Sequence, residues 1–199
     1  ALTSPAKNGG KRVQAFENLL KSYLKVKHVI AVNSGTSAIH AALLSLDIKA
    51  GDEVLIPSFT FVATANSVIA TGAKPVFVDI NKNDYTIDVS DVVKKINKNT
   101  KAILPVHLYG HPSDMDEVNS IAKDNSLQVV EDSCQSLGSL YDQKQTGTMG
   151  NVGCFSFYAS KVLTTGEGGA IVTSDDDLYE KLLMIRNHGM VNGYDTTIF

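Results

Sequence analysis

One lysine of the sequence, Lys161, lies among residues that suit a reactive site. Small and hydroxyl-bearing residues surround it, and a glycine-rich stretch follows at 166–169, before the next apolar run. This pattern is not typical of a lysine on a solvated surface. A partly desolvated lysine amine can act as a nucleophile or carry protons. The alternative, a loop lysine beside a tight turn, stays open on this stretch alone.

An aspartate closes another apolar run. Asp132 follows Gln128-Val129-Val130-Glu131, so a buried strand would deliver its carboxylate to the edge of a sheet where ligands bind. Gln135 comes one short turn later. A carboxylate in this place can pair with a ring nitrogen or a hydroxyl group of a bound cofactor. Capping of a helix is the other common use of an aspartate after a strand.

The stretch Asn33-Ser34-Gly35-Thr36-Ser37 lies between an expected strand and an expected helix. The first backbone N–H groups of a helix and the helix dipole attract anions, and Gly35 permits close approach of the backbone. The hydroxyl groups of Ser34, Thr36 and Ser37 suit a phosphate. A Ser or Thr that caps the helix explains the same pattern equally well.

These three features together point to one cofactor. A phosphate cradle, a carboxylate and a lysine at the ends of strands are the parts that hold pyridoxal 5'-phosphate. In such a site the lysine forms a Schiff base with the cofactor. The aspartate keeps the pyridine nitrogen protonated, which lets the ring accept electrons.

Short β-rich runs alternate with helical stretches along the chain. Strands are expected at residues 28–32, 53–57, 74–78, 102–106, 127–131, 152–157 and 169–173. Helices are expected at 13–24, 36–46, 62–71, 90–97, 113–124 and 176–186. This alternation predicts an α/β fold in which a sheet of about seven, mostly parallel strands carries helices on both faces.

The composition excludes several classes of protein. The 199 residues are 43% hydrophobic and 20% charged, and the formal net charge of −3 provides no general attraction for nucleic acid or an anionic membrane. No apolar run approaches the roughly 18–20 residues that span a bilayer. The two cysteines, Cys134 and Cys154, form no disulfide framework and lack the spacing of metal ligands. We therefore expect a cytoplasmic protein without a metal, a nucleic-acid partner or a membrane partner.

Eight short motifs occur in a fixed order along the chain. They are VNSGT at 32–36, GDEV at 51–54, PSFTFVAT at 57–64, KPVFVD at 74–79, PVHLYG at 105–110, EDSCQ at 131–135, GCFSF at 153–157 and RNHG at 186–189. Their combination, from about Gly10 to Met190, is highly specific. It resembles the DegT/DnrJ/EryC1/StrS family of sugar aminotransferases, which are pyridoxal-phosphate enzymes of fold type I.

The resemblance implies a role for each candidate residue. Lys161 would be the catalytic lysine that bonds to the cofactor and moves protons. Asp132 would pair with the ring nitrogen, and Gln135 would lie beside the ring hydroxyl. Phe61 would stack on the ring face; without the resemblance, a core aromatic at the start of a helix would explain it. The phosphate would be held by Gly35, Thr36 and Ser156.

By the same resemblance, the protein would transfer an amino group, typically from glutamate, to the keto group of a nucleotide-linked deoxysugar. Family members also carry a smaller C-terminal domain. Residues 1–199 would be the cofactor-binding large domain with its N-terminal helix, and the small domain would be missing from this chain. A homodimer is expected. Two alternatives are a sugar dehydratase of the same family, in which histidine stands at the position of Lys161, and a non-catalytic pleiotropic regulatory protein.

Overall fold

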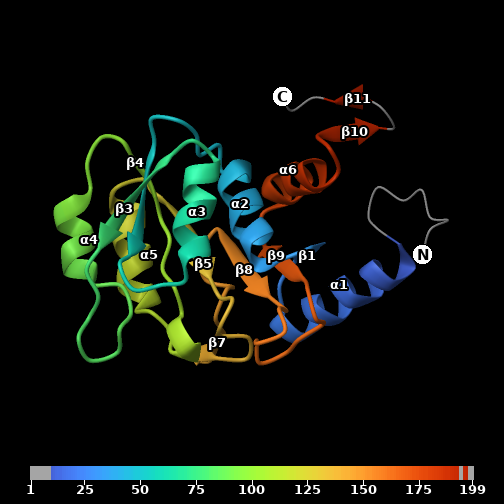
Figure 1. Cartoon of the computed structure of the whole chain (residues 1–199), viewed down its shortest axis with the longest axis horizontal. Coiled ribbons are helices and arrows are strands. Elements are labelled where there is room, and N and C mark those ends of the chain that lie inside the picture. Colours follow the sequence, from blue (N-terminus) through green and yellow to red (C-terminus); the bar gives the residue numbers. More distant parts are fainter. Residues whose placement is uncertain (1–9, 193–194, 197–199) are drawn as a thin grey trace.

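A sheet of seven strands forms the centre of the computed structural model, which describes residues 10–192 and 195–196 (Figure 1). The order in the sheet is β1-β9-β8-β5-β4-β2-β3. Its strands are β1 (His28–Val32), β2 (Glu53–Pro57), β3 (Lys74–Val78), β4 (Thr100–Ile103), β5 (Gln128–Asp132), β8 (Val152–Ser156) and β9 (Gly169–Thr173). Two small hairpins lie outside it, formed by β6 (Leu140–Tyr141) with β7 (Lys144–Gln145) and by β10 (Met190–Asn192) with β11 (Asp195–Thr196).

Within this sheet, only β9 runs against the other strands. The pairs β2–β3, β2–β4, β4–β5 and β5–β8 are parallel, whereas β9 is antiparallel to both β8 and β1. Gly169 at the beginning of β9 lies opposite Val32 and Ser156, the last residues of β1 and β8. The ends of β1, β5 and β8 and the beginning of β9 therefore share one edge. The expected α/β fold with about seven, mostly parallel strands is confirmed.

Helices cover both faces of the sheet (Figure 1). On one face lie α2 (Gly35–Ser45), α3 (Val62–Ala70) and α6 (Asp176–Arg186). The other face carries α4 (Val89–Lys95) and α5 (Met115–Asp124) over one half and α1 (Lys11–Leu24) over the other. None of the helices in the described ranges is long and apolar enough to span a membrane.

Side chains alternate between the two faces along each strand, as a strand period of two requires. In β5, Val130 packs into the cluster beneath α2, whereas Val129 packs with α5. In β8, Cys154 joins the cluster beneath α2, whereas Phe155 packs with α1. Because both faces are buried, these strands read as nearly continuous apolar runs.

Two predicted boundaries are wrong for identifiable reasons. β4 spans Thr100–Ile103 rather than 102–106, since Pro105 has no N–H for the ladder and Val106 makes only an isolated bridge to Asp132. α5 begins at Met115 rather than at 113, because the side chain of Asp114 caps it by accepting the backbone N–H of Glu117. The hairpins β6–β7 and β10–β11 were not predicted; each of their strands has only two or three residues.

Candidate active site

A cavity of about 350 Å3 lies at the shared edge of the sheet. This volume is in the range of small-molecule sites. Its lining includes the seven residues to which the family resemblance gives a role: Gly35, Thr36, Phe61, Asp132, Gln135, Ser156 and Lys161. Ser37, whose hydroxyl was also expected to suit a phosphate, lines a different cavity. The seven lining residues come from the beginning of α2, the chain before α3, the ends of β5 and β8, and the connection between β8 and β9. The fold thus brings them all into one place.

The beginning of α2 forms one wall of this cavity. Ser34 is the N-cap residue, and its hydroxyl oxygen accepts the backbone N–H of Ser37 at 3.1 Å. Within the described ranges, the backbone N–H groups of Gly35 and Thr36 meet no acceptor, as is usual for the first turn of a helix. Both expectations for this stretch therefore apply at once. Ser34 caps the helix, while the next two N–H groups are available to an anion in the cavity.

Gly35 is also required by packing. A Cβ atom at this position would lie 2.7 Å from Cβ of Ser156 and 2.8 Å from Sγ of Cys134. The absence of a side chain lets the first turn of α2 rest directly on the end of β8.

The thiol of Cys134 also lies at this contact. Burial, and then the charge of Asp132, raises the pKa of the Cys134 thiol well above its usual range. This thiol therefore stays protonated and contributes to packing.

Asp132 presents its carboxylate to the cavity from the end of β5. The side chain is almost fully buried. Its Oδ1 accepts the backbone N–H of Cys134 at 3.1 Å, and its Oδ2 accepts the hydroxyl proton of Thr64 at 2.9 Å. The chain turns after Asp132 and enters no helix, so the helix-capping alternative is wrong.

The amide of Gln135 has a defined orientation. The backbone N–H of Tyr109 donates to Oε1 of Gln135 at 2.9 Å. With the carbonyl end occupied, the NH2 end is the part of the amide left to donate to a ligand in the cavity. Tyr109 makes this contact with a φ of 52°, in the left-handed region that residues other than glycine rarely adopt.

Phe61 lies at the N-cap position of α3 and lines the cavity. Its side chain is 65% exposed, so the alternative of a core aromatic is wrong. An exposed ring beside a cavity offers a flat apolar face to a planar ligand.

Lys161 lies in the connection between β8 and β9. Because these strands are antiparallel, residues 157–168 must reverse the chain at the shared edge. The bonds from Phe157 N–H to the Gly168 carbonyl (2.8 Å) and from Thr165 N–H to the Phe157 carbonyl (3.0 Å) close the base of this loop. Lys161 lines the first cavity and also an adjoining cavity of about 370 Å3, together with Tyr109 and Val162. Lys161 is therefore shared by the two cavities, as are Gln135 and Ser160.

The lining also contains residues that sequence reasoning missed: Ile39, Ala63, Thr64, Tyr158, Ser160 and Glu167. Thr64 has the most direct role of these, because it bonds to Asp132 from 68 positions away in the sequence. It lies within the motif PSFTFVAT, but its residue type alone does not reveal a partner on another element.

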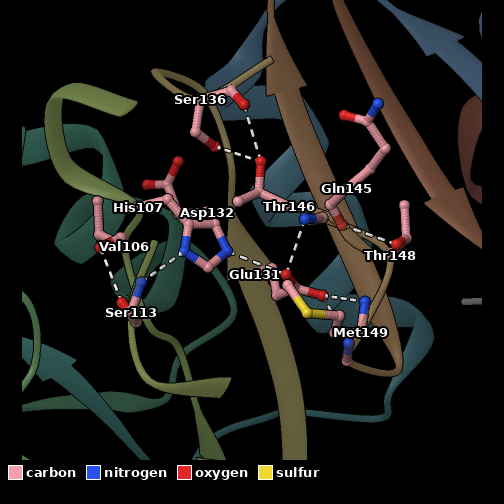
Figure 2. Close-up of polar contacts among 12 residues, drawn as sticks. Val106, His107, Ser113, Glu131, Asp132, Ser136, Gln145, Thr146, Thr148 and Met149 are labelled. Carbon is pink, nitrogen blue, oxygen red and sulfur yellow. Dashed lines mark hydrogen bonds and ion pairs between the residues drawn. The ribbon is translucent and has the colours of Figure 1, made fainter. Parts of the chain in front are cut away.

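Glu131 precedes Asp132 on β5 and is fully buried on the opposite face (Figure 2). Its Oε1 accepts the backbone N–H groups of Met149 (2.6 Å) and Gly150 (2.5 Å). Its Oε2 accepts hydrogen bonds from the backbone N–H of Gly147 (2.7 Å) and from the Nε2–H of His107 (2.9 Å). Four donors satisfy this carboxylate, which thereby holds the turn that leads into β8.

His107 is neutral in this network. The backbone N–H of Ser113 donates to its Nδ1 at 3.1 Å, so the ring proton is on Nε2 and is donated to Glu131 (Figure 2). The backbone N–H of His107 donates to the carbonyl of Asp132, whose own N–H donates to the carbonyl of Pro105. Residues 105–107 thus bond to both the backbone N–H and the carbonyl of Asp132. On the opposite face of the strand, the side chain of Glu131 bonds to His107 and to the turn before β8.

A model of the DegT/DnrJ/EryC1/StrS aminotransferase family matches residues 2–198. The chain belongs to this family.

Several proteins are similar to this chain in sequence or in structure. A GDP-perosamine synthase from Escherichia coli O157:H7 is 44% identical over 181 residues, which are 91% of this chain and 50% of that protein. The crystal structure of Streptomyces venezuelae DesV in complex with a ketimine intermediate superposes with a TM-score of 0.92 at 42% identity, covering 98% of this chain and 53% of that one. NtdA from Bacillus subtilis, solved with bound cofactor PMP, has a TM-score of 0.90 at 39% identity, over 96% and 44%. The chain spans about half the length of the relatives it matches.

The lining of the first cavity fits the cofactor that this family implies. Lys161 would provide an amine for the cofactor aldehyde, and Asp132 would provide a carboxylate for a protonated ring nitrogen. Gln135 would offer an amide donor to the ring oxygen, and the backbone of Gly35 and Thr36 would offer N–H groups to the phosphate. Among the described residues, no group of three or more His, Cys, Asp and Glu side chains is arranged to hold a metal ion.

Proposed function

We propose that this protein is a pyridoxal-phosphate-dependent aminotransferase that passes an amino group from glutamate to the keto group of a nucleotide-linked deoxysugar. The observation that carries the proposal is the single cavity in which Lys161, Asp132 and the beginning of α2 meet. The names of two relatives support the substrate class: a GDP-perosamine synthase and a dTDP-3-amino-3,4,6-trideoxy-alpha-D-glucose transaminase from Streptomyces venezuelae, which is 43% identical over 186 residues.

Pyridoxal phosphate, when bound, would supply an electron sink for the transfer. Asp132 would hold a proton on the ring nitrogen, because a buried carboxylate favours the charged form of its partner. The NH2 group of Gln135 would donate to the ring oxygen, and Phe61 would cover one face of the ring. Lys161 would anchor the cofactor through Nζ and then accept and return a proton at the same atom.

The adjoining cavity would receive the donor and the sugar in turn. It shares Lys161 with the first cavity and is also lined by Tyr109 and Val162, which are 79% and 84% exposed. Lys161 Nζ can serve both cavities only from their junction. Substrate and cofactor would therefore meet at the atom that moves the proton.

We further propose that residues 1–199 are the cofactor-binding large domain of a cytoplasmic homodimer. Four large apolar or aromatic residues that line the two cavities are exposed: Phe61, Tyr109, Tyr158 and Val162. Exposed apolar surface of this kind is typical of an interface. A partner subunit that covers it would also exclude water from the site.

The two alternatives have less support. A dehydratase of this family would carry histidine at the position that Lys161 occupies. A purely regulatory protein would not require a buried carboxylate, an oriented amide and a lysine in the lining of one cavity.

Reduction with borohydride after incubation with pyridoxal phosphate tests the proposal. We expect one modified peptide, with the label on Lys161, and loss of the label in Lys161→Arg. Replacement of Lys144, which lies in the hairpin β6–β7, should leave the labelling unchanged. A label on any other lysine, or no label, would refute the assigned site.

A further inference from the structure

The carboxylate of Asp132 is oriented by a chain of two threonine hydroxyls. Thr64 Oγ1 lies 2.9 Å from Oδ2 of Asp132 and 2.9 Å from Oγ1 of Thr60. A hydroxyl has one proton, and an ionised carboxylate can only accept. Thr64 therefore donates to Asp132, and Thr60 donates to Thr64. Both protons point toward the carboxylate.

The inner part of this relay is shielded from water, whereas Thr60 is half-buried. The exposed fraction of the residue is 1% for Thr64 and 5% for Asp132. In such surroundings a hydrogen bond to a charged group is stronger than in water, and an unpaired carboxylate oxygen is costly. The second oxygen, Oδ1, is held by the backbone N–H of Cys134. Within the described part of the chain, each oxygen thus has one partner and keeps further acceptor capacity for a ligand.

The relay also joins two parts of the cavity. Thr60 and Thr64 flank Phe61, whose exposed ring lines the cavity, and the backbone N–H of Thr64 donates to the carbonyl of Phe61 at 3.0 Å. The segment that positions the aromatic face therefore also fixes the rotamer of Asp132. The two contacts that a heteroaromatic ring would need, one on its face and one at its nitrogen, are set by one turn of chain.

We propose that Thr64 is a positioning residue that keeps the carboxylate of Asp132 aimed at a protonated ring nitrogen. This inference rests on the proposed function, because it takes pyridoxal phosphate as the ligand. A merely structural threonine would support the fold to the same degree whatever ring is bound. A positioning residue should matter only when the ring contains the nitrogen.

The test compares two ligands in the intact protein. Pyridoxal phosphate and 1-deazapyridoxal phosphate differ only in the ring nitrogen, and both are titrated into wild type, Thr64→Val and Thr64→Ser. We expect Thr64→Val to weaken binding of pyridoxal phosphate about tenfold, since one hydrogen bond to a charged group is lost. Binding of the deaza analogue should change by less than twofold. Thr64→Ser, which keeps the donor, should bind both ligands like wild type.

Thr71→Val is the matched control. It removes a threonine hydroxyl at the C-cap of the same helix, where the partner is the carbonyl of Val68. It should leave both affinities unchanged. Equal losses for the two ligands in Thr64→Val, or no loss for either, would overturn the inference. If wild type failed to bind pyridoxal phosphate through Lys161, the proposed function itself would fall instead.

If Thr64→Val did not fold, Thr60→Val would give the same test. It removes the outer hydroxyl of the relay and leaves the buried position intact. A smaller but still nitrogen-dependent loss, of about two- to fivefold, is expected from it. A loss that is equal for both ligands would again overturn the inference.

Discussion

Glu131 and Asp132 are neighbours on β5, and both are buried, yet their surroundings differ. Glu131 faces the side of α5 and accepts four N–H groups, three of them from the backbone of a single turn. Asp132 faces the cavity and, among the residues that the structure describes, accepts one N–H and one hydroxyl. The saturated carboxylate fixes the fold, whereas the unsaturated one keeps capacity for a ligand. Burial alone does not distinguish a structural charge from a functional one; the number of donors does.

The largest expected effect is a loss of aminotransferase activity when Asp132, rather than Glu131, is replaced. Asp132→Asn keeps the shape of the side chain but removes the charge that holds a proton on the ring nitrogen. Aminotransferase turnover should fall by about two to three orders of magnitude, because the electron sink is weakened. The protein should still fold and still be labelled at Lys161 after borohydride reduction. Turnover close to wild type would remove Asp132 from this role.

The second effect is on stability. Glu131→Gln replaces one acceptor oxygen by an NH2 group that faces backbone N–H donors. We expect the free energy of unfolding to fall by about 3 kcal/mol, as when a buried charged network is broken. Urea denaturation, compared with Asp132→Asn, measures the difference. An unchanged midpoint for Glu131→Gln, or a larger loss for Asp132→Asn, would reverse the assignment of the two residues.

The third effect concerns the other end of the cofactor ring. Gln135→Glu keeps an acceptor for the N–H of Tyr109 but presents an oxygen instead of NH2 to the cavity. Affinity for pyridoxal phosphate should fall about tenfold, because a donor to the ring oxygen is replaced by an acceptor. Fluorescence titration of the cofactor measures this change. Unchanged affinity would mean that the amide end of Gln135 does not face the ring oxygen.

The smallest effect involves a carboxylate outside both networks. Burial, and then the hydrogen bond that Tyr141 donates to Asp114, raises the pKa of Tyr141 to about 12. The folded protein thus favours the protonated phenol. The resulting stability is present below the ordinary tyrosine pKa of about 10 and is lost as the pH rises toward about 12. Ultraviolet titration of Asp114→Ala should show Tyr141 ionising at lower pH than in wild type. An identical titration curve would contradict this.

Much of the fold could be predicted because the hydrophobic pattern of each strand and helix is a local property of the sequence. Strands buried on both faces, such as β5 and β9, read as apolar runs, and their order of alternation with helices predicted the mostly parallel sheet. The direction of β9 could not be predicted. It depends on residues 157–168 returning to the same edge, which is decided by tertiary pairing with β8 and β1.

The candidate site was predictable to the extent that residue type implies chemistry. Lys161, Asp132 and Gly35 stood out because few other residues do what a lysine, an aspartate and a glycine do in those places. Thr64 did not, because its role arises only from a partner on another element. The same holds for His107, whose role arises from its buried bond to Glu131 on another element.

Nitrogen-15 NMR of protein loaded with ring-labelled pyridoxal phosphate tests the central claim most directly. The chemical shift of the ring nitrogen reports whether it carries a proton. We expect a protonated nitrogen in wild type and in Glu131→Gln, and an unprotonated one in Asp132→Asn, at the same neutral pH. A nitrogen that stays protonated in Asp132→Asn, or that loses its proton in Glu131→Gln, would contradict the assignment of Asp132 to the ligand and of Glu131 to the fold.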